Sequence, residues 1–121
     1  MQEALKAYGK ISQQVASQHE LEASLLLKAA SQLQTVRDDW QRKEDALDAA
    51  LLYNRKLWTI FLSSVTSSEN PLPRNIRQNA ANLGIYVMKQ TLSATTERRP
   101  EQLNSLIRIN RELAAGLMAH A

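Results

Sequence analysis

The chain of 121 residues contains no cysteine, and this absence excludes several classes of protein. Thiol nucleophiles, zinc ribbons and disulfide scaffolds all depend on cysteine. The two histidines, His19 and His120, are too few for a histidine-based metal site. We therefore expect no metal and no cofactor, and the lack of thiols fits a reducing cytoplasm.

Glycine and proline are also scarce, with three of each, and aromatic residues make up only 5% of the chain. Alanine, leucine, glutamine, arginine and glutamate, which favour helices, are abundant. This composition predicts an all-α protein. The length allows one small domain, which buries roughly two thirds of the surface that the unfolded chain exposes. We expect residues 1–121 to form a single compact bundle of about five helices.

Long apolar runs are missing. The longest uncharged apolar stretch, residues 57–65, is about half as long as a membrane span requires. The first eleven residues carry Glu3, Lys6 and Lys10 among only short apolar steps, so they lack the continuous apolar region of a secretory signal peptide. The sequence therefore predicts a cytoplasmic protein without membrane insertion.

The net charge of +3 is small and unevenly distributed. Residues 1–70 hold 8 Lys and Arg against 9 Asp and Glu, whereas residues 71–121 hold 7 against 3. Tyr86 is the only aromatic residue of the basic part, so a platform for stacking nucleic-acid bases is missing. RNA binding is only weakly indicated, and its phosphate contacts would come from Arg74, Arg77, Arg98, Arg99 and Arg108.

Capping residues and prolines divide the chain. Ser17 and Glu20 have the spacing of a capping box, and Pro73 and Pro100 suit the first turns of helices. A break is expected near residues 37–41, although one long bent helix across it is an alternative. The predicted helices cover residues 2–16, with Ala4, Tyr8, Ile11 and Val15 on one stripe, and residues 17–37, 42–65, 73–93 and 100–119.

Two asparagines occupy the middle of apolar helix faces. Asn54 and Asn110 each begin the pattern Asn-Arg-x-Leu, and Glu22 lies among leucines of the second predicted helix. A buried amide or carboxylate without partners is costly. We predict an internal polar network of Glu22, Asn54, Arg55, Asn110 and Arg111. The alternative for the two arginines is a solvated head beside the core.

The predicted helix 73–93 carries two apolar seams. One contains Ile76, Ala80, Leu83 and Val87, and the other contains Ala81, Ile85, Met88 and Leu92. Such a helix either packs between two neighbours or presents one seam outward, where an adaptable methionine would suit a groove for a partner helix. Leu27 and Leu52, which lie off the main stripes of their helices, are further candidates for partner contact.

Catalytic patterns are absent. No glycine-rich phosphate loop is present, and the acidic cluster Glu44, Asp45 and Asp48 has no histidine or cation to complete a metal or acid–base set. The serines at positions 63–64 and 67–68 have no histidine nearby in sequence to act as a base. The sequence therefore predicts a protein that is not an enzyme.

Several sequence runs are distinctive. They are residues 51–61 (LLYNRKLWTIF), 70–73 (NPLP), 83–87 (LGIYV), 106–111 (LIRINR) and 115–117 (AGL). In order and spacing, they resemble the flagellar biosynthesis regulator FlaF of alphaproteobacteria. Residues 7–8 and 21–26 are similar to amino-terminal elements of the same family, so the resemblance covers nearly the whole chain, although residues 34–44 are not distinctive.

This resemblance implies a cytoplasmic protein of flagellar assembly that acts on flagellin. It is expected to be a secretion chaperone that shields an amphipathic flagellin segment. Its predicted contact residues are Leu52, Tyr53, Ile85, Met88 and Leu92. The alternative is a factor that promotes flagellin synthesis, through flagellin messenger RNA or together with the regulator FlbT. A third reading is a structural piece of the export machine.

Overall fold

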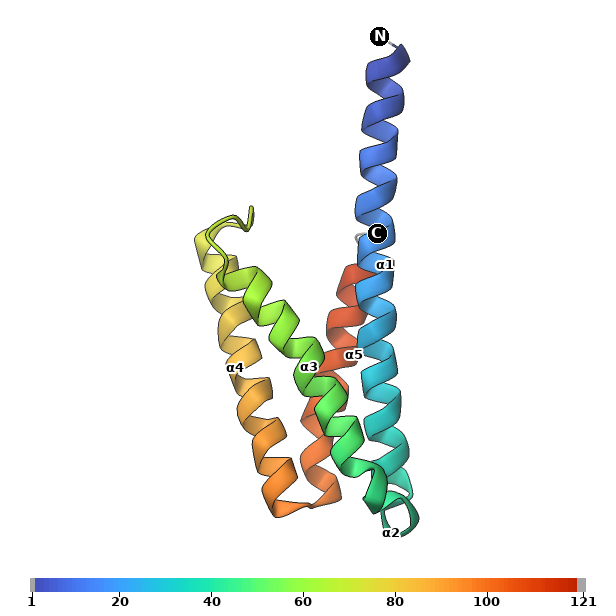
Figure 1. Ribbon diagram of the computed structural model, residues 1–121, viewed down its shortest axis with the longest axis vertical. Coiled ribbons are helices and arrows are strands. Elements are labelled where there is room, and N and C mark those ends of the chain that lie inside the picture. Colours follow the sequence, from blue (N-terminus) through green and yellow to red (C-terminus); the bar gives the residue numbers. More distant parts are fainter. Residues whose placement is uncertain (1, 120–121) are drawn as a thin grey trace.

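The computed structural model describes residues 2–119, except for the side chains at positions 8, 11–13, 15 and 16. Within this range every regular element is a helix and there is no strand, which confirms the predicted all-α fold (Figure 1). The elements are α1 (Gln2–Asp38), α2 (Trp40–Lys43), α3 (Leu47–Thr66), α4 (Arg74–Glu97) and α5 (Leu103–Ala119), with 3-10 turns at Glu44–Ala46 and Pro100–Gln102.

The first helix is longer than predicted. α1 continues through Ser17 and Glu20, so the expected start of a second helix at this capping box is wrong. Instead of closing a box, Gln18 donates a hydrogen bond to Glu22 one turn ahead (3.0 Å), a pairing that supports a continuous helix. The predicted break near residues 37–41 is confirmed, which excludes one bent helix across this point.

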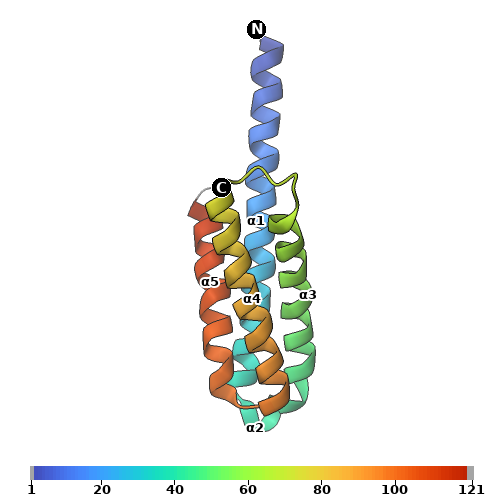
Figure 2. The same cartoon turned by 90° about the vertical axis from the view of Figure 1, so that its left-hand side faces the viewer.

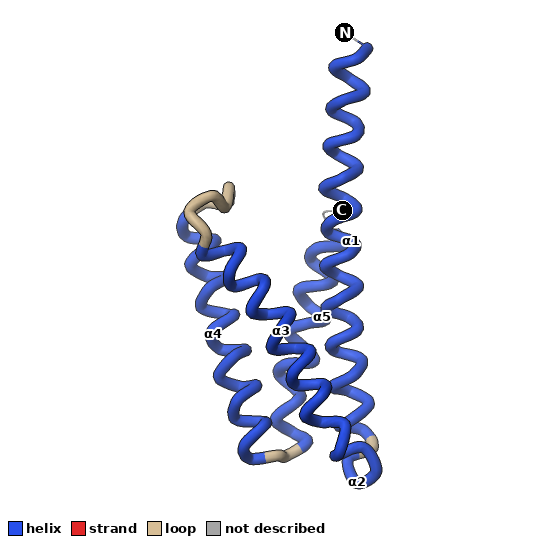
Figure 3. Tube along the Cα trace, viewed as in Figure 1, coloured by secondary structure: helices blue, strands red, loops and turns tan. Residues whose placement is uncertain are grey.

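α3 begins at Leu47, five residues after its predicted start at Arg42, because a short helix and a 3-10 turn occupy residues 40–46. The ends of the later helices follow the expected residues more closely. Pro73 directly precedes α4, whereas Pro100 begins a 3-10 turn that leads into α5. α4 continues four residues past its predicted end at Ser93 and stops at Arg98, whose φ of 56° is left-handed. Figure 3 shows how little of the chain lies outside helices.

The long helices form two pairs. α1 packs mainly on α5 and α3 mainly on α4, and contacts between α1 and α3 join the pairs. The pairs meet at the end that holds α2 and the α4–α5 connection, which we call the closed end (Figures 1 and 2). They diverge toward the loop before α4, which we call the open end, and α1 extends beyond the other helices there.

The core is built mostly from leucines and alanines. Gly84 permits a close approach of α3 and α4, because a Cβ at this position would lie 2.5 Å from Leu62 Cδ2. The largest fully buried apolar side chains are Leu26, Leu33, Leu47, Leu51, Val87, Leu103 and Leu106.

Candidate functional site

A buried polar contact ties α3 to α5. Asn110 Nδ2 donates a hydrogen bond to Asn54 Oδ1 (2.7 Å), and Trp58 Nε1 donates to Asn110 Oδ1 (2.9 Å). Both asparagines are completely buried. Because apolar neighbours cannot satisfy these amides, the contact fixes the axial register of the two helices.

The other three residues of the predicted network lie elsewhere. Arg55 and Arg111 are exposed, since one residue beyond each asparagine the helix has turned by about 100°. Glu22 accepts its hydrogen bond from Gln18 on the same helix. The prediction also missed Trp58, although a buried indole N–H usually needs an acceptor and could have indicated it.

A cleft of about 420 Å³ opens between the two helix pairs, and we call it the open-end cleft. All four long helices contribute to its walls, and most of the lining is apolar. Its lining residues are His19, Glu22, Trp58, Phe61, Leu62, Ser64, Val65, Asn70, Leu72, Ile76, Ala80, Leu83, Leu113 and Leu117.

The cleft exposes side chains that a fully closed bundle would bury. Phe61 and Leu117 are half-buried and pack against the edge of the core, and the Phe61 ring meets Trp58 edge to face at 5.7 Å. Ile76 is 46% exposed and Leu83 37%. On the α1 wall, His19 Nδ1 is buried and has no hydrogen-bond partner among the described residues. The cleft is therefore a mainly apolar groove, with polar residues on the α1 wall (His19 and Glu22) and at the end of α3 and in the loop after it (Ser64 and Asn70).

Four of the five predicted contact residues lie together on a second surface. Leu52, Met88 and Leu92 line a shallow depression of about 360 Å³ between α3 and α4. Ile85 lies one turn from Met88 outside this depression, and both Ile85 and Leu92 are exposed. We call these four residues the outer α3–α4 surface. Of the two seams read from the sequence, the one with Ile85, Met88 and Leu92 lies on this surface. The other lines the open-end cleft at Ile76 and Leu83 and is buried at Val87.

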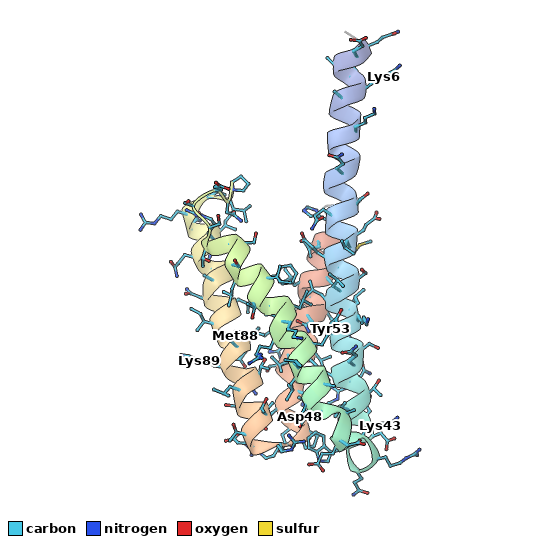
Figure 4. The ribbon with its side chains drawn as sticks, in the orientation of Figure 1. Lys6, Lys43, Asp48, Tyr53, Met88 and Lys89 are labelled. Carbon is cyan, nitrogen blue, oxygen red and sulfur yellow. The ribbon has the colours of Figure 1, made fainter. Side chains whose placement is uncertain are left out.

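Tyr53 lies apart from this surface. It lines a different depression together with Gln32 and Val36, between α3 and α1. The Lys28 ammonium lies 5.3 Å from the centre of the Tyr53 ring, a cation–π contact across the two helices. Figure 4 shows Tyr53 on the α1 side of α3 and Met88 on α4. Tyr53 therefore contacts α1 and does not belong to the outer α3–α4 surface.

Ion pairs gather at the closed end. Arg98 Nη1 lies 2.8 Å from Asp48 Oδ1 and its Nε lies 3.6 Å from Glu44 Oε1. The hydrogen bond to Asp48 raises the pKa of the Arg98 guanidinium and so favours its charged form. Arg99 pairs with Glu97 at 3.1 Å. Two of the five arginines considered for RNA contact are therefore already paired with carboxylates.

Other kinds of site find no support in the part of the chain that the structure describes. Among residues 2–119, no group of three or more His, Cys, Asp or Glu is placed to hold a metal ion. In the same range, no helix combines the length and the apolar character that crossing a membrane would require.

Comparison with known proteins identifies the family of the chain. The family model described as flagellar protein FlaF matches residues 4–117, which confirms the resemblance read from the sequence. Searches of the curated proteins and of the solved structures found no match.

Proposed function

Because the chain belongs to the FlaF family of flagellar proteins, we propose that it is a flagellin-binding secretion chaperone. In this proposal it holds an amphipathic helix of flagellin in the open-end cleft and so keeps flagellin unassembled before export. The observation that carries the proposal is the cleft itself, an apolar groove whose walls come from four helices. Helix-in-groove binding uses this geometry, with an apolar helix face laid against apolar walls.

The exposed side chains of the cleft supply the driving force. Phe61, Ile76 and Leu83 keep part of their apolar surface in contact with water, and a bound helix would cover it at about 25 cal/mol per Å². The flagellin segment loses conformational freedom when it becomes ordered, and this loss offsets part of the gain. Such a balance suits a complex that must later release flagellin to the export gate.

The outer α3–α4 surface is the alternative position for the flagellin segment. Its exposed Ile85 and Leu92 favour it, since two large apolar side chains two turns apart on one helix face attract a partner. The open-end cleft is the stronger candidate because it is concave and surrounds a ligand from several sides, as most binding sites do.

One pair of variants distinguishes the two positions. Leu83→Asp places a charge in the cleft, and Leu92→Asp places the same charge on the outer surface; both side chains are exposed in the free protein, so both variants should fold. Calorimetry with purified, depolymerised flagellin should show affinity about tenfold weaker or worse for L83D and nearly unchanged for L92D. The opposite ranking, with far-UV helix signals unchanged, would move the site to the outer surface.

The competing function is regulation of flagellin synthesis, through flagellin messenger RNA or through FlbT. It rests on the basic character of residues 71–121, where Arg74 and Arg108 are exposed. Direct RNA binding would weaken steeply as salt is raised, because phosphate contacts release counterions. A titration of the flagellin leader RNA at two salt concentrations tests this, and absence of binding at low salt excludes the direct form.

A further inference from the structure

The outer α3–α4 surface is apolar along its middle. Leu52, Met88 and Leu92 line its depression, and Ile85 extends the apolar stretch by one turn of α4. Leu92 is 68% exposed and Ile85 48%. Removing such side chains from water favours the binding of a partner but does not select its chemistry. The charges around the surface make that selection.

Basic side chains flank the surface on both sides. At about 100° per residue, Lys56 lies about 40° from Leu52 around α3, on the side away from the depression. Lys89 lies about 40° from Ile85 around α4 in the same way, and Figure 4 shows it on the outer side of this helix. Arg55 lines the depression itself. All three cations are exposed, and none forms an ion pair within residues 2–119.

Carboxylates are scarce on the same two helices. α3 contains only Asp48 and α4 contains only Glu97. Asp48 lines the depression at its closed-end side, where it is paired with Arg98 at 2.8 Å. Glu97 is paired with Arg99 at 3.1 Å. The positive charge of the outer α3–α4 surface is therefore not neutralised by carboxylates of its own helices.

We infer that the outer α3–α4 surface binds an acidic amphipathic helix of a second partner protein. The apolar face of this helix packs on Leu52, Met88 and Leu92. Carboxylates on its two flanks pair with Lys56 on one side and Lys89 on the other. The occupant follows from charge complementarity, because a basic helix in the same position would be repelled from both sides. The inference goes beyond the proposed function and does not depend on it.

The outer α3–α4 surface and the open-end cleft lie on opposite sides of α4. Leu83 and Ile76 line the cleft, and they lie about 160° and 180° from Ile85 around the helix. A helix bound on one side therefore does not cover the other. The chain can hold its acidic partner and a ligand of the cleft at the same time.

Two synthetic helical peptides test the inference. Both have about five turns and carry leucines along one face. One peptide has glutamate on both flanks of this face, and the other has lysine at the same positions. Fluorescence anisotropy with the full chain should show the glutamate peptide binding about tenfold more tightly than the lysine peptide. The difference should shrink as salt is raised, because exposed charges are screened.

Matched variants locate the binding. Lys89→Glu should weaken binding of the glutamate peptide about fivefold and strengthen binding of the lysine peptide. Lys43→Glu is the same change at the closed end, outside the surface, and should leave both affinities within about twofold of wild type. Leu92→Asp should weaken both peptides about tenfold. All three side chains are exposed, so the far-UV helix signal should not change.

The other outcomes overturn the inference in distinguishable ways. Equal binding of the two peptides would mean that the surface selects apolar character alone, and no binding of either would mean that it is not a docking site. A wild-type dimer in sedimentation that becomes a monomer in L92D would mean that a second copy covers the surface.

Flagellin separates the inference from the proposed function. If depolymerised flagellin displaces the glutamate peptide, the outer α3–α4 surface is the flagellin site, so the inference fails and the chaperone function stands. If the wild-type chain binds the glutamate peptide but no flagellin, the proposed function fails and the inference stands.

Discussion

The two ends of the bundle use the same helices in different ways. At the closed end, Leu47 and Leu103 are fully buried where α3 and α5 begin. At the open end, Phe61 and Leu117 reach only half burial, and Ile76 stays 46% exposed. The side chains at both ends are large and apolar. The difference therefore lies in the divergence of the helix pairs, which leaves apolar surface uncovered at one end, as at many interaction sites.

Side-chain polar contacts occur at both ends of the bundle. At the closed end, Arg37 donates to Asn104 across α1 and α5 (3.0 Å), and Arg98 joins the end of α4 to Asp48 on α3. At the open end, Arg77 Nη1 donates to the Ser67 carbonyl within the α3–α4 loop (3.1 Å), a contact inside one pair. Each of these three contacts therefore lies within one helix pair, and the hydrogen bonds of Asn110 with Asn54 and Trp58, midway along α5 and α3, are contacts that join the two pairs.

The largest expected effect concerns the buried contact between the two ends. Asn110→Ala removes the acceptor of Trp58 Nε1 and the donor to Asn54, and it leaves a cavity. The free energy of unfolding in urea should fall by about 4 kcal/mol. Asn75→Ala, on the exposed first turn of α4, should change it by less than about 0.5 kcal/mol. Equal losses in the two variants would contradict a structural role for the pair.

A matched pair of leucines on α5 sharpens the comparison of the ends. Leu106 is fully buried, whereas Leu113, two turns further along the same helix, lines the open-end cleft. Leu106→Ala should cost about 3 kcal/mol, and Leu113→Ala about 1 kcal/mol because water already reaches that wall. Chemical denaturation measures both. A loss for L113A as large as that for L106A would show that the open end is packed like the core.

The left-handed residue at the closed end should have a smaller effect. Arg98 ends α4 with a φ of 56°, a conformation that glycine adopts without strain and alanine does not. Arg98→Gly and Arg98→Ala both lose the ion pairs to Asp48 and Glu44, so their difference isolates the backbone. R98G should melt a few degrees above R98A. Identical melting temperatures would mean that the helix end rearranges.

The smallest expected effect depends on pH. Arg37 Nε donates to Asp38 Oδ1 (2.9 Å) at the end of α1, and this hydrogen bond lowers the pKa of the Asp38 carboxyl. The stabilisation is present above the unfolded-state pKa and is lost as the pH falls through the lower folded-state pKa. The stability difference between wild type and Arg37→Met should therefore narrow in acid. A stability difference that widened in acid would show that Arg37 does not lower the pKa of Asp38.

Local patterns predicted much of this structure. Sequence spacing places Asn54 and Asn110 in apolar helix faces and Pro73 at the start of a helix. These assignments depend only on residues a few positions away in the chain. The helix start predicted from the capping box at Ser17 is wrong because the helical pattern of α1 continues through this position. The open-end cleft was missed because Phe61 and Leu117 have the pattern of ordinary core residues. These two side chains are partly exposed because the two helix pairs diverge, and the spacing of residues within one helix does not report how helix pairs are arranged.

The most direct test of the open end as a binding surface is chemical protection. The chain has no cysteine, so a single introduced thiol reports on one position. I76C places it at the mouth of the cleft and L92C on the outer α3–α4 surface, both exposed in the free protein. Excess depolymerised flagellin should slow alkylation at position 76 several-fold and leave position 92 unchanged. An unchanged rate at position 76, with flagellin demonstrably bound, would contradict the account.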